Sequence, residues 1–354
     1  MSAPKSSPRP AILVTGLSGN LGQHVAPLLV EHPLVGIDLF RPRVNHPQVE
    51  FCQLDLSQPD APDVLENLIR EAQVQLVVHL AFVLDPARTG ATDRHRQWEI
   101  NVRGTSHLLD AIQRVNRVRH QVQFFLYLSS VTSYGPMLPG PVDEDFPQQP
   151  RTYTYALHKK ETDQLCRDRF PRLNGCSVYI VRGHIFLGRN VDNFIVHSLR
   201  GEPARRSWFG RWLARRRWKL PLLLPRGPEY DGLYQFMHID DAARLMAWLC
   251  HNFEPGKLVI LNAQGRGSPL TAADIGRVGH VPVLRLGSYK FVGFLYRLFW
   301  ALGVSPVPAD AYPYFAGSYV MNTARLERLL GADYLRIIRF TSEEAMRAIV
   351  EPPA

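Results

Sequence analysis

The sequence predicts an α/β protein built around a doubly wound parallel sheet. Apolar, β-rich runs alternate with longer stretches of helical pattern in the first half of the chain, which is the order of elements in such sheets. The runs are continuous rather than alternating, as expected of strands buried on both faces. We expect strands at residues 11–15, 34–38, 49–54, 75–81 and 123–129, and helices at roughly 21–31, 61–72, 92–118 and 153–170.

The second half predicts a smaller region of mixed structure. A strand at 177–182 is followed by a long insertion that ends near residue 231. The pattern then returns to strand at 234–239, helix at 240–250 and strand at 258–262. Short elements follow, and Thr341 with Glu344 forms the capping-box pattern that opens a last helix.

Composition narrows the class of protein. The 354 residues, 45% of them hydrophobic, suit one large unit or two closely packed domains. We expect residues 1–10 to be a disordered leader, because they contain no apolar run that could act as a secretion signal or membrane span. The four cysteines are scattered, which argues against disulfides or a zinc site and favours a reducing cytoplasm. They are Cys52, Cys166, Cys176 and Cys250.

Gly16, Gly19 and Gly22 directly follow the first strand and open the first helix. Glycines at such a turn allow a tight bend, a close approach of a pyrophosphate to the backbone, and close packing of helix on strand. The helix N-terminus adds free N–H groups and a positive dipole. The spacing is wider than Gly-x-Gly-x-x-Gly, but the strand before it and the helix after it still predict a dinucleotide site.

Asp38 lies 22 residues beyond Gly16, at the end of the second strand. A carboxylate at this place accepts hydrogen bonds from ribose hydroxyls and repels a 2′-phosphate, which favours NAD over NADP. Arg41 and Arg43 lie close by and keep NADP as the less favoured alternative. The simpler alternative for Asp38 is a solvated acid at a strand end.

Tyr155 and Lys159 stand four residues apart in the predicted helix 153–170. This spacing places both side chains on one helix face, with Cβ atoms about 5–6 Å apart. A free phenol titrates near pH 10, so it is a poor acid or base at neutral pH unless a nearby positive charge favours the phenolate. We expect Lys159 to supply that charge. The pair alone is a weak signal, and its position after the glycine turn strengthens it.

With these motifs the chain resembles the extended short-chain dehydrogenase/reductase family, in particular its NAD-dependent epimerase/dehydratase group. The resemblance covers roughly residues 11–265, and its motifs occur in the family's order. They are Thr15-Gly16-x-x-Gly19-x-x-Gly22, Asp55-Leu56, Leu80-Ala81, Asn101-Val102-x-Gly104-Thr105, Ser129-Ser130-Val131-Thr132-Ser133-Tyr134-Gly135, and Tyr155-x-x-x-Lys159. The run Phe236 to Asp241 resembles a strand-to-helix junction whose acids are mainly structural, so we expect no metal there.

The resemblance implies a Rossmann-type sheet and a catalytic set of Ser130, Tyr155 and Lys159, with Ser129 and Thr132 as alternatives to Ser130. It also implies an NAD site formed by Gly16, Ser18, Gly19, Asn20, Leu21, Gly22, Asp38, Asp55, Leu56, Leu80, Ala81, Asn101, Tyr155 and Lys159. We divide the chain accordingly into the leader 1–10, an NAD-binding domain 11–188, a basic Trp-rich insertion of the substrate lobe 189–231, a return to the first domain 232–264, and a C-terminal substrate lobe 265–354. The resemblance further implies a homodimer.

Two departures from the family bear on the substrate. Sugar-nucleotide dehydratases carry an Asp-Glu pair where this chain has Val131-Thr132, so the extra acid and base for water elimination are missing. Nucleotide-sugar enzymes of the family place Asn where this chain has Ile185. A nucleotide-diphosphate substrate would therefore lose a polar contact.

The excess positive charge is concentrated in one segment. Residues 200–226 contain nine Lys or Arg against the single acid Glu202, a net charge of +8 out of +9 for the whole chain. Within this segment, Trp208, Phe209, Trp212 and Leu213 recur at helical spacing among arginines, a pattern suited to an anionic membrane surface. A solvated loop or a diphosphate-binding edge is the alternative, and nucleic acid is not expected as a partner.

Residues 291–302 are apolar on nearly every side but too short to span a bilayer. We interpret them as a buried helix of the substrate lobe. The leading hypothesis is an NAD(H)-dependent oxidoreductase acting on a secondary alcohol or ketone, apolar or lipid-like, in the cytoplasm or at a membrane surface through 205–219. The alternatives are an NAD-dependent sugar or sugar-nucleotide epimerase, and a non-catalytic NAD-binding scaffold.

Overall fold

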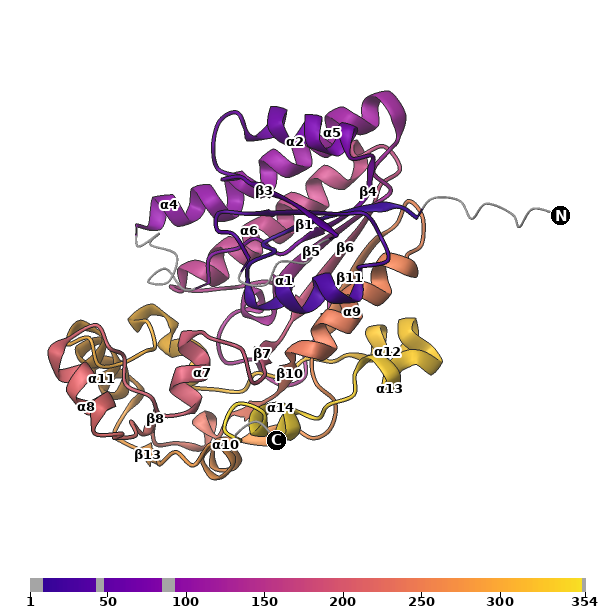
Figure 1. Ribbon diagram of the computed structural model, residues 1–354. Coiled ribbons are helices and arrows are strands. Elements are labelled where there is room, and N and C mark those ends of the chain that lie inside the picture. The colour runs from indigo at the N-terminus through magenta and orange to yellow at the C-terminus, as the bar shows by residue number, and fades with distance from the viewer. Residues whose placement is uncertain (1–8, 43–47, 85–92, 352–354) are drawn as a thin grey trace.

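A seven-stranded parallel sheet forms the centre of the larger part of the molecule (Figure 1). The computed structural model describes residues 9–42, 48–84 and 93–351. The strand order is β11-β6-β5-β4-β1-β2-β3, and all neighbours are parallel. The strands are β1 (Ala11–Thr15), β2 (Leu34–Asp38), β3 (Val49–Gln53), β4 (Val74–His79), β5 (Phe124–Ser130), β6 (Ser177–Gly183) and β11 (Leu258–Ala263). The predicted fold class is confirmed.

Helices cover both faces of this sheet (Figure 1). On one face lie α2 (Ala61–Glu71), α5 (Gly104–Arg119) and α6 (Thr154–Arg169), and on the other α1 (Asn20–Val25) and α9 (Ile239–His251). The side chains of β1 show why its apolar run is continuous. Leu13 belongs to the core under α2, α5 and α6, whereas Ile12 and Val14 belong to the core under α1 and α9.

Two predicted helices are interrupted. The first ends at Val25 and continues as a 3-10 turn, Ala26–Leu28, since Pro27 has no N–H to donate within a helix. The predicted helix 92–118 consists of α4 (Arg94–Trp98), a π-helical turn (Glu99–Arg103) and α5. This wider turn contains Asn101, whose side chain bonds both the N–H and the C=O of Val83.

The predicted strand 234–239 is wrong as a single element. It is divided into β9 (Leu233–Tyr234), which pairs antiparallel with β12 (Leu270–Thr271), and β10 (Phe236–His238), which pairs parallel with β7 (Ile185–Leu187). The chain changes partner at Gln235. The strand ends at His238 because its Nδ1 accepts the N–H of Asp240 and so caps α9.

The smaller region lies below the sheet in the view of Figure 1 and contains short helices and two-stranded sheets. Two pieces far apart in the sequence join there, because β8 (Leu222–Leu224) pairs parallel with β13 (Val283–Arg285). The helices are α7 (Phe194–Leu199), α8 (Trp208–Arg215), α10 (Ala272–Gly279), α11 (Tyr289–Ala301), α12 (Ala324–Leu330), α13 (Tyr334–Ile337) and α14 (Ser342–Arg347). None of the helices in the described ranges is long and apolar enough to cross a bilayer.

The capping box predicted at Thr341 and Glu344 opens α14. One apolar core extends through both regions, from Ile12 to Ile349. The division of the chain into lobes therefore stays a prediction, and most of the leader lies outside the described residues.

Candidate active site

A cavity of about 240 Å³ opens where four parallel strands end and the smaller region begins. The residues that follow or end these strands line it: Gly16 after β1, Leu80 after β4, Ser130 on β5 and Gly183 on β6. Ligands of open α/β sheets bind at this edge, where the strand order reverses. In this sheet the reversal lies between β1 and β4.

The glycine turn forms the cavity wall nearest to β1. Gly16 has φ +73°, and a Cβ atom on it would lie 2.6 Å from the backbone N of Ala81. A Cβ on Gly22 would lie 2.3 Å from the carbonyl oxygen of Gly16. Only glycine fits either place. The backbone of Gly16, Gly19, Asn20, Leu21 and Gly22 is therefore exposed to the cavity at the start of α1, which fits a dinucleotide pyrophosphate.

Asp38 lies beside this turn. Its carboxylate accepts the N–H of Ser18 at 2.9 Å and the N–H of Phe40 at 3.2 Å. These two bonds fix the orientation of the carboxylate. Arg41 is exposed, and Arg43 lies outside the described residues.

Six predicted cofactor residues do not line the cavity: Ser18, Asp38, Asp55, Leu56, Ala81 and Asn101. The Asp55 carboxylate accepts hydrogen bonds from Ser57 and Gln58 and pairs with Arg96. Burial alone would raise its pKa, but these hydrogen bonds outweigh burial and lower it. Leu56 packs beside Gly104, and Asn101 holds the backbone of Val83. Asp55, Leu56 and Asn101 stay predictions as cofactor residues; Asn101 also contacts His158 on α6 at 3.3 Å.

The structure brings Tyr155 and Lys159 to the cavity on one face of α6. The Lys159 ammonium donates to the carbonyl oxygen of Leu128 at 2.6 Å and lies 3.5 Å above the Phe82 ring. It is 5.6 Å from the centroid of the Tyr155 ring. Phe82 also meets Tyr155 edge to face at 5.4 Å. Phe82 was not singled out from the sequence, which offers no motif for it beyond its place after Leu80-Ala81.

The protonation of this pair differs from expectation. Burial raises the pKa of Tyr155, and the hydrogen bond with Ser130 only partly opposes this shift. Burial also lowers the pKa of Lys159 well below its usual value. Lys159 is not among the groups that shift the Tyr155 pKa, so the expected lowering by its charge is not found. Tyr155 is therefore a neutral phenol at neutral pH, the form that donates a proton.

Among the three hydroxyls proposed for the catalytic position, Ser130 is the one that reaches Tyr155. Its Oγ accepts both the N–H and the O–H of Thr132, at 3.2 and 3.0 Å. Because both acceptor positions of Ser130 are engaged, its own proton is free to serve the hydrogen bond with Tyr155. Ser129 also lines the cavity, but its hydroxyl donates to Asp163 at 3.1 Å.

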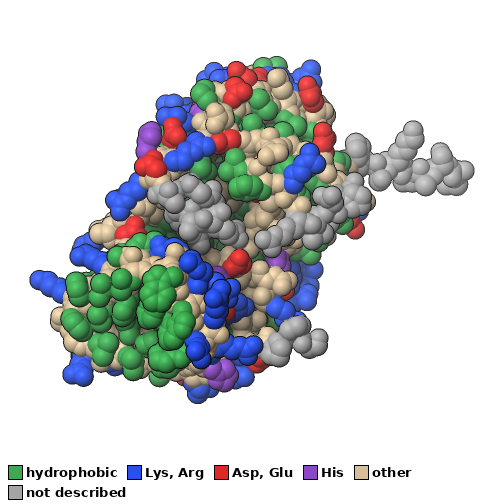
Figure 2. Space-filling model, turned by 60° about the vertical axis from the view of Figure 1, so that its left-hand side comes forward, with side chains coloured by type: hydrophobic (Ala, Val, Ile, Leu, Met, Phe, Trp, Pro, Cys, Tyr) green, Lys and Arg blue, Asp and Glu red, His purple; other side chains and the backbone are tan. Residues whose placement is uncertain are grey.

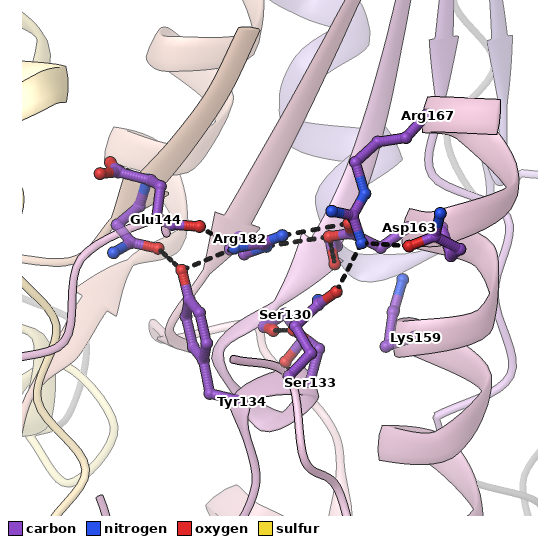
Figure 3. A network of polar contacts seen from close by, with 12 residues as sticks. Ser130, Ser133, Tyr134, Glu144, Lys159, Asp163, Arg167 and Arg182 are labelled. Atoms are coloured by element: carbon purple, nitrogen blue, oxygen red, sulfur yellow. Dashed lines mark hydrogen bonds and ion pairs between the residues drawn. The ribbon is translucent and has the colours of Figure 1, made fainter. Parts of the chain in front are cut away.

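Arg182 and Asp163 form a buried network next to these serines, which Figure 3 shows from close by. The Arg182 guanidinium also donates to the hydroxyl of Tyr134 at 2.9 Å and to the carbonyl oxygen of Glu144 at 2.7 Å. The network joins the end of β6 to α6 and to the turn after Ser130. Asp163 was not singled out from the sequence, although it lies one helical turn after Lys159.

The remaining wall of the cavity is apolar and aromatic. Residues from six separate segments form it: Ile185, Phe186, Phe194, Ile195, Leu222, Leu224, Tyr234, Tyr296, Tyr314, Phe315 and Tyr319. Of the described residues that line the cavity, Lys159 is the only lysine or arginine. His184 is buried there, and burial lowers its pKa to about 4, so it is neutral at pH 7. Of the residues in this apolar wall, only Ile185 was singled out from the sequence.

The acids at the start of α9 have structural partners. Asp240 contacts His24 at 2.7 Å, and Asp241 pairs with Arg244 and accepts the N–H of Phe340. Within the described ranges, no group of three or more His, Cys, Asp or Glu side chains is arranged to hold a metal ion.

The parallel sheet, the glycine turn at its switch point and the Ser130/Tyr155/Lys159 set define a nicotinamide-dependent enzyme of the short-chain dehydrogenase/reductase class. Residues 12–262 match the profile of the NAD dependent epimerase/dehydratase family, and the chain belongs to this family. Its membership confirms the resemblance inferred from the motifs, the enzyme class and NAD as the cofactor.

The individual relatives share less than 30% sequence identity with this chain. The UDP-glucose 4-epimerase of Corynebacterium glutamicum is 29% identical over 154 residues, which is 43% of this chain and 44% of that protein. The chain thus matches less than half the length of this relative. The structure of WbmH from Bordetella bronchiseptica in complex with NAD⁺ matches this chain with a TM-score of 0.66 at 18% identity. The match covers 96% of this chain and 97% of WbmH. The UDP-glucose complex of UDP-glucose 4-epimerase from Thermotoga maritima has the same TM-score and coverage at 16% identity. At these identities the likeness shows the fold.

Proposed function

We propose that the protein is an NAD(H)-dependent oxidoreductase that transfers hydride at a secondary alcohol or ketone of an apolar, lipid-like substrate. The observation that carries this proposal is the composition of the cavity wall. Its chemical end holds Ser130, Tyr155 and Lys159, whereas its substrate end is built from aliphatic and aromatic side chains. Such a wall stabilises a substrate mainly by removing apolar surface from water.

The proposed task of Tyr155 is to exchange a proton with the substrate oxygen. In ketone reduction the phenol gives its proton to that oxygen as the carbon receives the hydride, and in alcohol oxidation both transfers run in reverse. In the substrate complex the single Ser130 proton turns from the Tyr155 oxygen to this substrate oxygen, where negative charge develops. Lys159 holds the ribose, and the glycine turn with Asp38 holds the rest of NAD, which supplies or accepts the hydride.

The sugar-nucleotide alternative is supported by the relatives, two of which are UDP-glucose 4-epimerases. The cavity provides less support for it. A diphosphate carries two negative charges, and the lining offers no arginine among the described residues. At the position of Ile185, an apolar side chain faces the cavity in place of an amide.

Turnover in the presence of NAD⁺ distinguishes these functions. We would screen sterols, prenols and nucleotide sugars at the nicotinamide absorbance. Net NADH formation with a sterol or prenol supports the proposal. Interconversion of a nucleotide sugar without net NADH would instead establish epimerisation.

Tyr155→Phe tests the assigned proton donor. We expect turnover to fall by about 10²–10⁴-fold while NAD binding, measured by calorimetry, is retained. Turnover unchanged in the variant would remove Tyr155 from this role, and NAD binding without any turnover in the wild type would favour the non-catalytic scaffold.

We also propose a homodimer and a peripheral membrane contact through residues 205–219. The first is supported only by the family resemblance. The second is supported by the amphipathic helix α8, where Trp208 and Trp212 are exposed among arginines.

A further inference from the structure

A continuous apolar face lies on the smaller region, bordered by lysine and arginine side chains (Figure 2). Single exposed apolar residues are normal, but a contiguous patch of this kind marks an interaction site. We call it the α8–α11 face, after the two helices that supply it. Its exposed apolar residues are Trp208, Phe209, Trp212, Phe291, Phe294, Leu298, Phe299 and Leu302.

Close contacts fix the two helices to one another. The N–H of Ala204, just before α8, donates to the carbonyl oxygen of Val304, just after α11, at 2.7 Å. A Cβ on Gly210 would lie 2.8 Å from the carbonyl oxygen of Gly303. The face is therefore a preformed surface rather than two independent segments.

The orientation of α11 corrects the interpretation of residues 291–302 as a buried helix. Val292 and Tyr296, four residues apart, are buried, and Tyr296 lines the active-site cavity. Phe294 is 58% exposed and Leu298 38% exposed. One side of α11 thus forms part of the cavity wall, while its other side belongs to the α8–α11 face.

The charge around the face identifies the kind of partner. Residues 205–219 include seven Lys or Arg and no acid, and Lys290 and Arg297 on α11 are exposed as well. A second copy of the same face would bring these cations together, which opposes pairing of two copies. Anionic lipid headgroups would neutralise the cations while the acyl region covers the aromatic side chains.

We infer that the α8–α11 face docks the protein on an anionic lipid bilayer, with the aromatic side chains of α11 inserted and the arginines of α8 at the headgroups. This inference extends the membrane contact proposed for 205–219, because the structure adds α11 as an inserting element. Docking in this orientation turns the α11 wall of the cavity toward the bilayer, the source of an apolar substrate.

Vesicle binding of the full-length protein tests the inference. The vesicles are phosphatidylcholine with or without phosphatidylglycerol, and the variants are Phe294→Glu and, as a matched control, Val118→Glu, which alters a 65% exposed residue of α5. We expect wild type and Val118→Glu to bind the anionic vesicles at least tenfold better than Phe294→Glu. Binding should fall as salt is raised. Brominated lipids should quench the fluorescence of the wild type but not of Phe294→Glu.

Two outcomes would overturn the inference. One is equal binding of Phe294→Glu and Val118→Glu to anionic vesicles. The other is a dimer in sedimentation that Phe294→Glu alone converts to monomer, because the face would then be a protein interface. NAD binding without vesicles should be the same in all three proteins. If vesicle binding occurs and no lipid-like alcohol is oxidised, only the proposed substrate fails; if oxidation occurs without vesicle binding, only the docking fails.

Discussion

Asp163 accepts two hydrogen bonds from Arg182, at 2.9 and 3.1 Å, in a position where neither side chain is more than 2% exposed (Figure 3). The pair connects α6, which carries Tyr155 and Lys159, to the end of β6. Ser129 also donates to Asp163, so the same carboxylate fixes the strand end that presents Ser130. The buried pair and Ser129 thus hold α6 and the strand end in a fixed relative position, with Tyr155 next to Ser130.

Removing this carboxylate should destabilise the fold. We expect Asp163→Asn to lower the free energy of unfolding by about 3–5 kcal/mol, because it leaves the Arg182 charge buried without its counter-ion. Urea unfolding measures the change. Asp168→Asn, an exposed site on the same helix, is the control and should alter stability by less than about 0.5 kcal/mol. Equal effects of the two substitutions would contradict the structural role of the pair.

Thr132 should act through Ser130. Its O–H donates to Ser130 at 3.0 Å, and the hydrogen bond between Ser130 and Tyr155 opposes the rise of the Tyr155 pKa caused by burial. We expect Thr132→Val to slow alcohol oxidation by about tenfold and to move the midpoint of its pH profile to higher pH, because the phenolate is less stabilised. Since both groups act by one route, Ser130→Ala combined with Thr132→Val should be no slower than Ser130→Ala alone. Additive losses would show independent roles.

Asp38 should set the preference between NAD and NADP. Asp38→Ser removes a negative charge and the carboxylate oxygens proposed to accept from the ribose, so we expect weaker NAD binding and a change of at least about tenfold in the NAD/NADP affinity ratio. Calorimetric titration with both cofactors measures this ratio. Asp60→Asn, at an exposed position before α2, should leave it unchanged. The same ratio in Asp38→Ser and wild type would assign the discrimination to another residue.

Three buried histidines should reduce stability in mild acid. Burial, with repulsion from Lys159 in the first case, lowers the pKa of His79 from 6.5 to about 3, and burial lowers that of His158 and His184 to about 4. Below pH 6.5 the unfolded chain therefore binds protons that the folded protein does not. The free energy of unfolding should rise with pH in this range, by up to about 1.4 kcal/mol per pH unit for each histidine.

Urea unfolding at several pH values between roughly 4 and 7 would measure this dependence. His79→Gln should give a flatter dependence than wild type, and His95→Gln, an exposed site, should not. A slope unaffected by His79→Gln would mean that His79 is not neutral in the folded protein.

The sheet was predictable because its strands are parallel and buried on both faces. This burial leaves continuous apolar runs such as 11–15 and 123–129 that need no periodicity to be found. The proposed catalytic set was predictable for another reason. Gly16 stands where the backbone requires glycine, and Ser130 and Tyr155 stand in motifs that resemble those of the family.

The substrate end was not predictable in the same way. Residues 291–302 are apolar on nearly every side, so their pattern could not distinguish a buried helix from one with an exposed face. The pairings of β7 with β10 and of β8 with β13 involve three residues per strand, and such short elements depend on tertiary contacts. Burial, which reverses the expected shift of the Tyr155 pKa, is likewise a property of the folded chain.

The cavity wall includes Gly16 and Tyr319, so residues about 300 positions apart in the chain meet at one site. During synthesis, the sheet from β1 to β6 can form long before Tyr314, Phe315 and Tyr319 are available to cover the site. Backbone hydrogen bonds from Leu138 to Ser318 and from Val142 to Val320 then fix this late segment beside the turn that follows Ser130. The cofactor-binding half can therefore form before the segment that covers the site. In a nascent chain that has not yet added residue 319, this segment does not yet shield Tyr155 from water.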